Sequence, residues 1–161
     1  MLRVAFALLL AACAPHPIVG SWAGNALPIA LSTTLTFVAA SQLSFTGTDA
    51  RIEATLSTES EVTLGTLVVK ARYAIDARTV PEKMTLEIQS IVLAPLGGEP
   101  ARIDEKNAAA GGTLLCFPLG NVEGCVAKKQ TLELSVDGDT LRIFISDGEI
   151  ARLAILFQRK K

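Results

Sequence analysis

The sequence has few of the side chains on which most enzymes and nucleic-acid-binding proteins depend. Its single histidine, His16, lies near the start of the chain, so no Ser-His-Asp, Cys-His or His-rich zinc site is expected within the fold. Aromatic residues make up 5% of the chain, too few to form a stacking platform for single-stranded nucleic acid. The formal net charge is -1, which provides no attraction to a polyanion. We therefore expect no nucleic-acid partner and no metal site.

The acidic residues and glycines also lack the arrangement of a catalytic or phosphate-binding site. No glycine-rich loop follows a strand and opens a helix, so no nucleotide cofactor is expected. Carboxylate pairs lie in polar, turn-like stretches, where solvated side chains are far more common than acid–base pairs or calcium sites. Such pairs are Glu59 with Glu61, Asp104 with Glu105, and Asp137 with Asp139. The sequence therefore predicts that the protein is not an enzyme and has no cofactor.

The first thirteen residues carry the clearest pattern in the chain. Arg3 precedes an unbroken apolar run over residues 4–12, which is typical of a secretion signal and is much shorter than the roughly 20 residues of a membrane span. The segment Leu10-Ala11-Ala12-Cys13 resembles the bacterial lipobox, in which the cysteine is lipidated and becomes the new N-terminus. The resemblance implies that residues 1–12 are a signal peptide and that residues 13–19 are the lipidated cysteine and a short tether. The alternative is an ordinary secretory leader, with Cys13 removed.

The lipobox resemblance also implies a location. The protein is expected to be attached to a membrane of the cell envelope through the lipid on Cys13, because two or more acyl chains anchor a protein stably. Ala14 follows the cysteine, where an aspartate would imply retention at the inner membrane. We therefore expect the periplasmic face of the outer membrane in a bacterium with two membranes, and the cell surface otherwise.

Two cysteines remain, Cys116 and Cys125, and the expected export places them in an oxidising compartment. Residues 117–124 between them include a proline, two glycines and an asparagine, which are turn formers. The spacing therefore predicts a disulfide that closes the neck of a hairpin. A redox-active or metal-binding pair is the alternative, and it needs a low thiol pKa or further ligands.

Apolar and polar residues alternate with period two from Gly20 onward, which predicts half-buried antiparallel strands in a single domain over residues 20–161. A tight hairpin is expected at Asp137-Gly138 and another turn at Asp147-Gly148. Residues 94–112 form the longest irregular stretch, either a lid or a loop. Strands are expected at 20–22, 33–40, 43–45 after a short turn, 52–56, 66–75, 83–89, 91–93, 132–136, 141–145 and 153–159.

This pattern predicts an all-β fold, an up-and-down antiparallel meander of about eight to ten short strands closed into a barrel, with a β-sandwich as the alternative. The two ends of the domain resemble lipocalin-like, calycin-type barrels, because Gly20-x-Trp22 matches the G-x-W of the first strand and Arg159 matches a basic residue of the last. The resemblance implies that Arg159 lies over Trp22 and closes one end of the barrel. Otherwise Trp22 is an ordinary core residue and Arg159 part of a solvated tail.

Two functions fit these expectations. In the first, the barrel interior binds a small apolar ligand or lipid. In the second, the interior is filled by side chains and the barrel is a structural or protein-interaction module of the envelope. Barrels of eight strands occur in both forms. The sequence leaves this choice open.

Overall fold

The computed structural model describes residues 14–146 and 152–161, so the signal peptide expected at residues 1–12, Cys13 and the turn expected at Asp147-Gly148 lie outside the described residues. The described part is all-β and contains no helix that is long and apolar enough to cross a membrane. Its strands are β1 (Gly20–Gly24), β2 (Leu31–Ser32), β3 (Phe37–Thr46), β4 (Asp49–Thr58), β5 (Thr63–Asp76), β6 (Glu82–Pro95), β7 (Asp104–Asn107), β8 (Thr113–Leu119), β9 (Val122–Ala127), β10 (Lys129–Asp137), β11 (Thr140–Ser146) and β12 (Arg152–Arg159).

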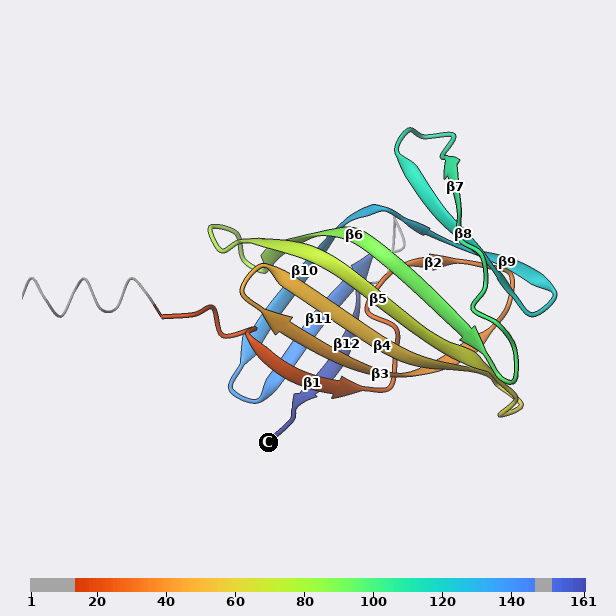
Figure 1. Cartoon of the computed structure of the whole chain (residues 1–161). Helices are drawn as coiled ribbons and strands as arrows, with labels where there is room; N and C mark the ends of the chain where they lie inside the picture. Colours follow the sequence, from red (N-terminus) through yellow and green to blue (C-terminus); the bar gives the residue numbers. More distant parts are fainter. Residues whose placement is uncertain (1–13, 147–151) are drawn as a thin grey trace, which may run out of the picture.

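Eight of these strands form a closed antiparallel barrel in the order β1-β12-β11-β10-β6-β5-β4-β3 (Figure 1). In the sequence these strands follow one another as an up-and-down meander, and β1 closes the barrel by pairing with both β3 and β12. The prediction of a closed, lipocalin-like β-barrel is confirmed. The chain does not form the β-sandwich that was the alternative.

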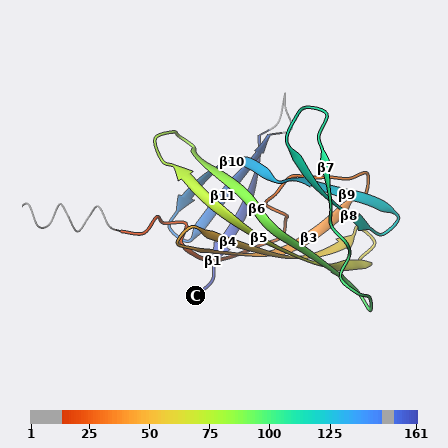
Figure 2. The ribbon, with the colours of Figure 1, turned by 45° about the horizontal axis from the view of Figure 1, so that its top comes forward.

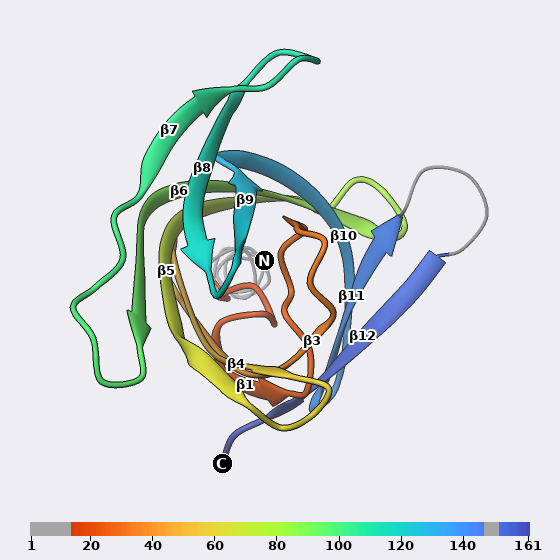
Figure 3. The same cartoon turned by 90° about the vertical axis from the view of Figure 1, so that its right-hand side faces the viewer.

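The other four strands come from two insertions in the meander and form a second sheet, in the order β2-β9-β8-β7. Figure 2 shows this sheet at the end of the barrel opposite the point where residues 14–19 enter. In Figure 3 the β8–β9 hairpin and the segment before β3 extend over the opening of the barrel. We call this the cap end. The tether end carries residues 14–19 and the turns at 47–48, 77–81 and 138–139.

The turn expected between residues 40 and 43 is wrong, because β3 runs unbroken from Phe37 to Thr46. Ala39, Ser41 and Leu43 all face the interior and are buried. A serine at an inward position interrupts the apolar pattern without interrupting the strand. Its hydroxyl has no hydrogen-bond partner among the described residues, so it is an isolated polar atom in the core.

The two strands expected at 83–89 and 91–93 are one strand, β6. Lys70 of β5 lies opposite Ser90, and Ala71 lies opposite Ile88, so Gln89 is the extra residue of a β-bulge. The bulge shifts the alternation by one residue and keeps both Ile88 and Ile91 inside the barrel.

The irregular stretch expected at 94–112 contains a strand. β7 pairs with β8 through Asp104–Asn107, whose side chains are all exposed. Two ion pairs strengthen this sheet, Lys106 with Glu123 and Lys128 with Glu105. Because none of these side chains is buried, no alternation of apolar residues marks the strand in the sequence. The hairpin expected at Asp137-Gly138 is present, with Gly138 and Asp139 as its turn residues.

Candidate functional site

The tether end of the barrel is closed by Trp22 and Arg159, which face each other on β1 and β12. The guanidinium carbon of Arg159 lies 4.2 Å from the centre of the Trp22 ring, a cation–π contact. The Trp22 side chain is fully buried, and its Nε1 donates a hydrogen bond of 2.8 Å to the carbonyl oxygen of Ile18. Gly20 has a φ of 133°, which L side chains rarely adopt, and a Cβ there would lie 2.7 Å from Arg159 Nη1; both favour glycine two residues before the tryptophan.

Arg159 also fixes the chain that leads into the barrel. Its Nη1 donates a hydrogen bond of 3.0 Å to the carbonyl oxygen of Val19, and its Nη2 donates one of 2.6 Å to that of Pro17. Its Nε lies 3.5 Å from Oδ1 of Asp139, in the turn between β10 and β11. One side chain therefore joins the first strand, the last strand and the tether.

The tether is docked on the barrel and does not hang free. Ile18 is fully buried in the core. His16 Nε2 lies 2.9 Å from Oε2 of Glu82, at the start of β6, and His16 Nδ1 accepts a hydrogen bond from the backbone N–H of Ile18. The histidine thus links the tether to the start of β6. Within the described residues its ionic partner is this one carboxylate, so it forms no catalytic triad there.

Aromatic packing continues inward from this end. Phe45 of β3 and Tyr73 of β5 meet edge to face, with 5.2 Å between ring centres. Burial, and secondarily the negative charge of Asp49, raises the pKa of the Tyr73 hydroxyl. This group therefore stays neutral, which suits its place at the edge of an apolar core.

Many inward-facing side chains in the middle of the barrel are fully buried. A cavity that could admit water would leave exposed area on the residues that line it. Leu132 and Ile155 keep 7–8% exposure, whereas eight other inward-facing side chains have none. They come from β1, β4, β5, β10, β11 and β12, so the packing involves most of the barrel wall. These eight inward-facing residues are Trp22, Leu56, Leu67, Val69, Leu134, Leu141, Ile143 and Phe157.

The cap end is closed by the two insertions. Gln130, a buried polar residue at the start of β10, accepts a hydrogen bond from the N–H of Ala30 and donates one to the carbonyl oxygen of Ala127. It thereby ties the segment before β3 to the end of β9. The apolar side chains of both insertions join the core of the barrel: Leu27, Ile29, Leu115, Phe117, Leu119 and Val126.

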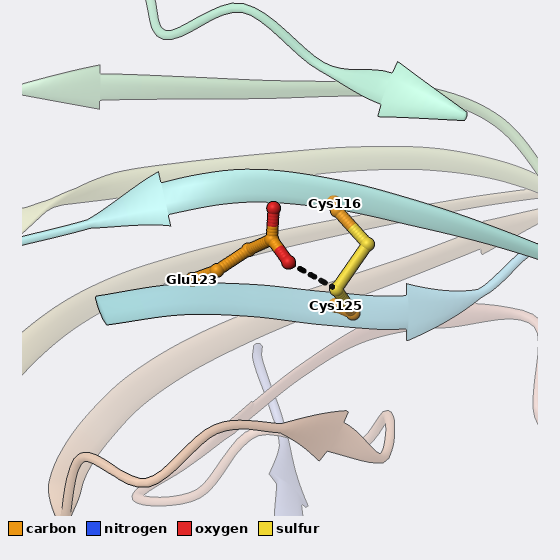
Figure 4. Close-up of side chains that lie close together, drawn as sticks. All are labelled: Cys116, Glu123 and Cys125. Atoms are coloured by element: carbon orange, nitrogen blue, oxygen red, sulfur yellow. Dashed lines mark hydrogen bonds between the residues drawn. A yellow bond between two sulfur atoms is a disulfide. The ribbon is translucent and has the colours of Figure 1, made fainter. Parts of the chain in front are cut away.

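Cys116 and Cys125 form a disulfide between directly opposed residues of β8 and β9, as predicted (Figure 4). Oε2 of Glu123 lies 3.6 Å from Sγ of Cys125, so two sulfurs and a carboxylate are gathered at one point. Sulfurs joined to each other are not thiolates and do not act as zinc ligands. The carboxylate is in addition paired with Lys106. In this state the cluster is a structural staple of the cap.

Removing this staple should weaken the fold. Replacing Cys116 and Cys125 together by alanine is expected to lower the free energy of unfolding by roughly 2–3 kcal/mol, because the crosslink restricts a loop of about ten residues in the unfolded chain. Urea denaturation measures the change, and the reduced wild-type protein should show the same loss. Two free thiols in the denatured, unreduced protein, or an unchanged stability of the double variant, would contradict the assignment.

An apolar groove of about 380 Å³ lies at the cap end, where β5 begins and β6 ends. Its volume is in the range of small-molecule sites, roughly 300–1,000 Å³. Leu96 is 73% exposed at its edge. The main apolar residues of the wall are Leu64, Leu93, Leu96, Ala101, Pro118 and Leu119.

The carboxylate pairs noted in the sequence are exposed and do not face a common reaction site. Four of the acidic residues pair with basic side chains: Asp104 with Arg102, Glu105 with Lys128, Asp137 with Arg142, and Asp139 with Arg159. Glu59 and Glu61 lie in the exposed turn between β4 and β5.

The β8–β9 hairpin of the cap was predicted from the two cysteines, but the sheet that it forms with β2 and β7 was not. Leu27, Ile29 and Leu31 alternate in a segment that contains a proline, and this alternation was the available sign of a buried segment. Comparison of the chain with protein-family models, with curated proteins and with solved structures finds no match.

Proposed function

We propose that the protein is a lipid-anchored component of a bacterial cell envelope, in which a filled barrel serves as a rigid scaffold and presents its cap end to other envelope components. Lipidation of Cys13 follows from the lipobox resemblance of residues 10–13. The barrel then stands with its tether end at the membrane and its cap end away from it.

The observation that carries the scaffold part of this proposal is the packing of the interior. Carriers of the lipocalin type need an internal cavity with an entrance. Here Trp22 and Arg159 cover one end, two insertions cover the other, and the inward-facing side chains are buried, many of them with no exposed area. This arrangement favours a structural or interaction module over an interior carrier.

A second candidate function is binding of a small apolar ligand on the outside of the barrel. The groove beside Leu96 supports it, because its walls are apolar and its volume suits a small molecule. Such a ligand would be held between the barrel and the cap.

Native mass spectrometry of protein purified from its own membranes distinguishes these functions. The filled scaffold is expected to carry its covalent acyl chains and no further ligand in stoichiometric amount. A retained apolar ligand would contradict the scaffold proposal, and two variants then locate it. Loss of the ligand in Leu96→Asp but not in Val38→Asp places it in the groove, since Val38 is an exposed residue on the outer face of β3. A ligand that is retained in both variants lies outside the groove, in the interior or in another surface pocket.

A further inference from the structure

We propose that the tether end rests directly on the bilayer and that the turn between β5 and β6, residues 77–81, inserts Val80 among the lipid headgroups. This inference depends on the proposed lipid anchor at Cys13. It adds the orientation of the barrel and the residue in contact with lipid.

The length of chain between anchor and barrel carries the first step. His16 is three positions after Cys13 and is already held by Glu82, and Arg159 holds Pro17 and Val19. Three extended residues span about 10 Å. A lipidated Cys13 would therefore keep the tether end within about that distance of the membrane surface, and a docked tether limits the tilt of the barrel.

The position of the turn carries the second step. His16, Pro17, Thr79, Val80 and Pro81 line one shallow pocket, so the tip of the β5–β6 hairpin lies beside the tether. Figure 1 shows this hairpin on the side of the barrel where residues 14–19 enter. Of all the apolar side chains in the described chain, Val80 is among the most exposed, at 101%. An exposed apolar tip next to a lipid anchor faces the bilayer.

The turn is ordered, so its tip is presented in a fixed direction. The backbone N–H and the Nε of Arg78 donate hydrogen bonds to Oδ1 of Asp76, and Nη2 donates one to Oδ2. The hydroxyl of Thr79 donates one to the carbonyl oxygen of Asp76. The bonds from Arg78 lower the pKa of the Asp76 carboxyl to about 2, so the carboxylate stays charged in any ordinary medium.

Charge at the tether end does not select anionic lipid. Both signs are present there in similar number: Arg78, Lys83, Arg159, Lys160 and Lys161 lie together with Asp49, Asp76, Glu82, Asp137 and Asp139. The contact is expected to be apolar and to form equally on neutral and anionic bilayers. Its dependence on salt is expected to be weak.

A pair of single-cysteine variants tests the proposal. Val80→Cys places a thiol at the tether end, and Val62→Cys places one at the cap end, where Val62 is 60% exposed. Each variant is purified as the lipidated protein and then labelled with an environment-sensitive fluorophore. Only the new cysteine reacts, because Cys13 carries the lipid and Cys116 and Cys125 form the disulfide. The proteins are reconstituted into vesicles of neutral phosphatidylcholine. The Val80 probe is expected to shift to the blue and to lose intensity to a spin-labelled lipid, whereas the Val62 probe does neither.

The outcomes separate this inference from the proposed anchor. Protein that floats with the vesicles but shows both probes in water overturns the membrane contact and leaves the anchor intact. Protein that carries no acyl chain and stays off the vesicles overturns the anchor and the inference together. Both labelled chains are also prepared without the lipidated cysteine, and there both probes should report water. A blue-shifted fluorophore at position 80 in that soluble form overturns the inference, because the fluorophore would then be in contact with protein and not with lipid.

Discussion

Replacing Trp22 by alanine is expected to lower the free energy of unfolding by about 3–5 kcal/mol, the usual cost of truncating a buried tryptophan. The variant loses a fully buried ring, the cation–π contact with Arg159, and the donor to the carbonyl oxygen of Ile18. For a domain of this size the midpoint of thermal unfolding should fall by roughly 10–17 °C. Calorimetry or thermal circular dichroism measures the change.

Two comparisons separate the role of Trp22 from general sensitivity of the barrel. Leu156→Ala on β12 removes an apolar side chain that is 55% exposed, and its effect should be within about 0.5 kcal/mol. Trp22→Phe keeps a ring under Arg159 and loses the hydrogen bond to Ile18, so it should lie between the wild type and Trp22→Ala. If Trp22→Ala and Leu156→Ala unfold at the same temperature, Trp22 does not close the barrel.

Removal of Cys13, the proposed site of lipidation, should move the protein from the membrane to the soluble fraction almost completely. A single acyl chain binds a bilayer with an association constant of only about 10⁴ M⁻¹, and two or more give stable attachment. Without them, the remaining contact at the tether end is one valine and a balanced set of charges, which is too weak to hold the protein. Cys13→Ala is best expressed behind an ordinary cleavable leader, so that residues 1–12 do not remain as an apolar anchor. Fractionation of cells and intact-mass measurement give the result.

The matched control for this experiment is the double variant Cys116→Ala/Cys125→Ala, which lacks the disulfide and keeps Cys13. It should remain in the membrane fraction, with the mass of the acyl chains still present. Wild-type protein that is soluble and starts after residue 13 would identify an ordinary secretory leader. Cys13→Ala protein that remains in the membrane would remove the basis for a lipid anchor.

The barrel could be predicted because most of its strands bury one face. In β4, and in β10 after Gln130, the inward residues are apolar and the outward ones polar or charged, and these strands are recognisable from the sequence. Where an inward position is polar, as at Ser41, or where a bulge changes the phase, as at Gln89, the pattern suggests a break that the backbone does not have. Both errors divided a single strand in two.

The second sheet could not be predicted in this way. β7 has no buried face, so its place is set by backbone pairing with β8 and by ion pairs to β9 and to Lys128, which are distant in sequence. The contact of Arg159 with Trp22 was anticipated only through resemblance at both ends of the chain. The docking of His16 against Glu82 gives no sequence signature, because it depends on where β6 begins in space.

The pairing of β1 with β12 affects when the barrel can finish folding. The two strands that close the barrel lie at opposite ends of the domain, so the last seam forms only when residues 152–159 are available. Pairing of strands so far apart in the sequence is slow, because bringing distant segments together costs chain entropy before their contacts form. A polypeptide that crosses a membrane through a narrow channel has to stay unfolded until its transfer is nearly complete. If this chain is exported as proposed, its topology delays closure of the barrel to that moment, and the disulfide of the cap can then form in the compartment where folding ends.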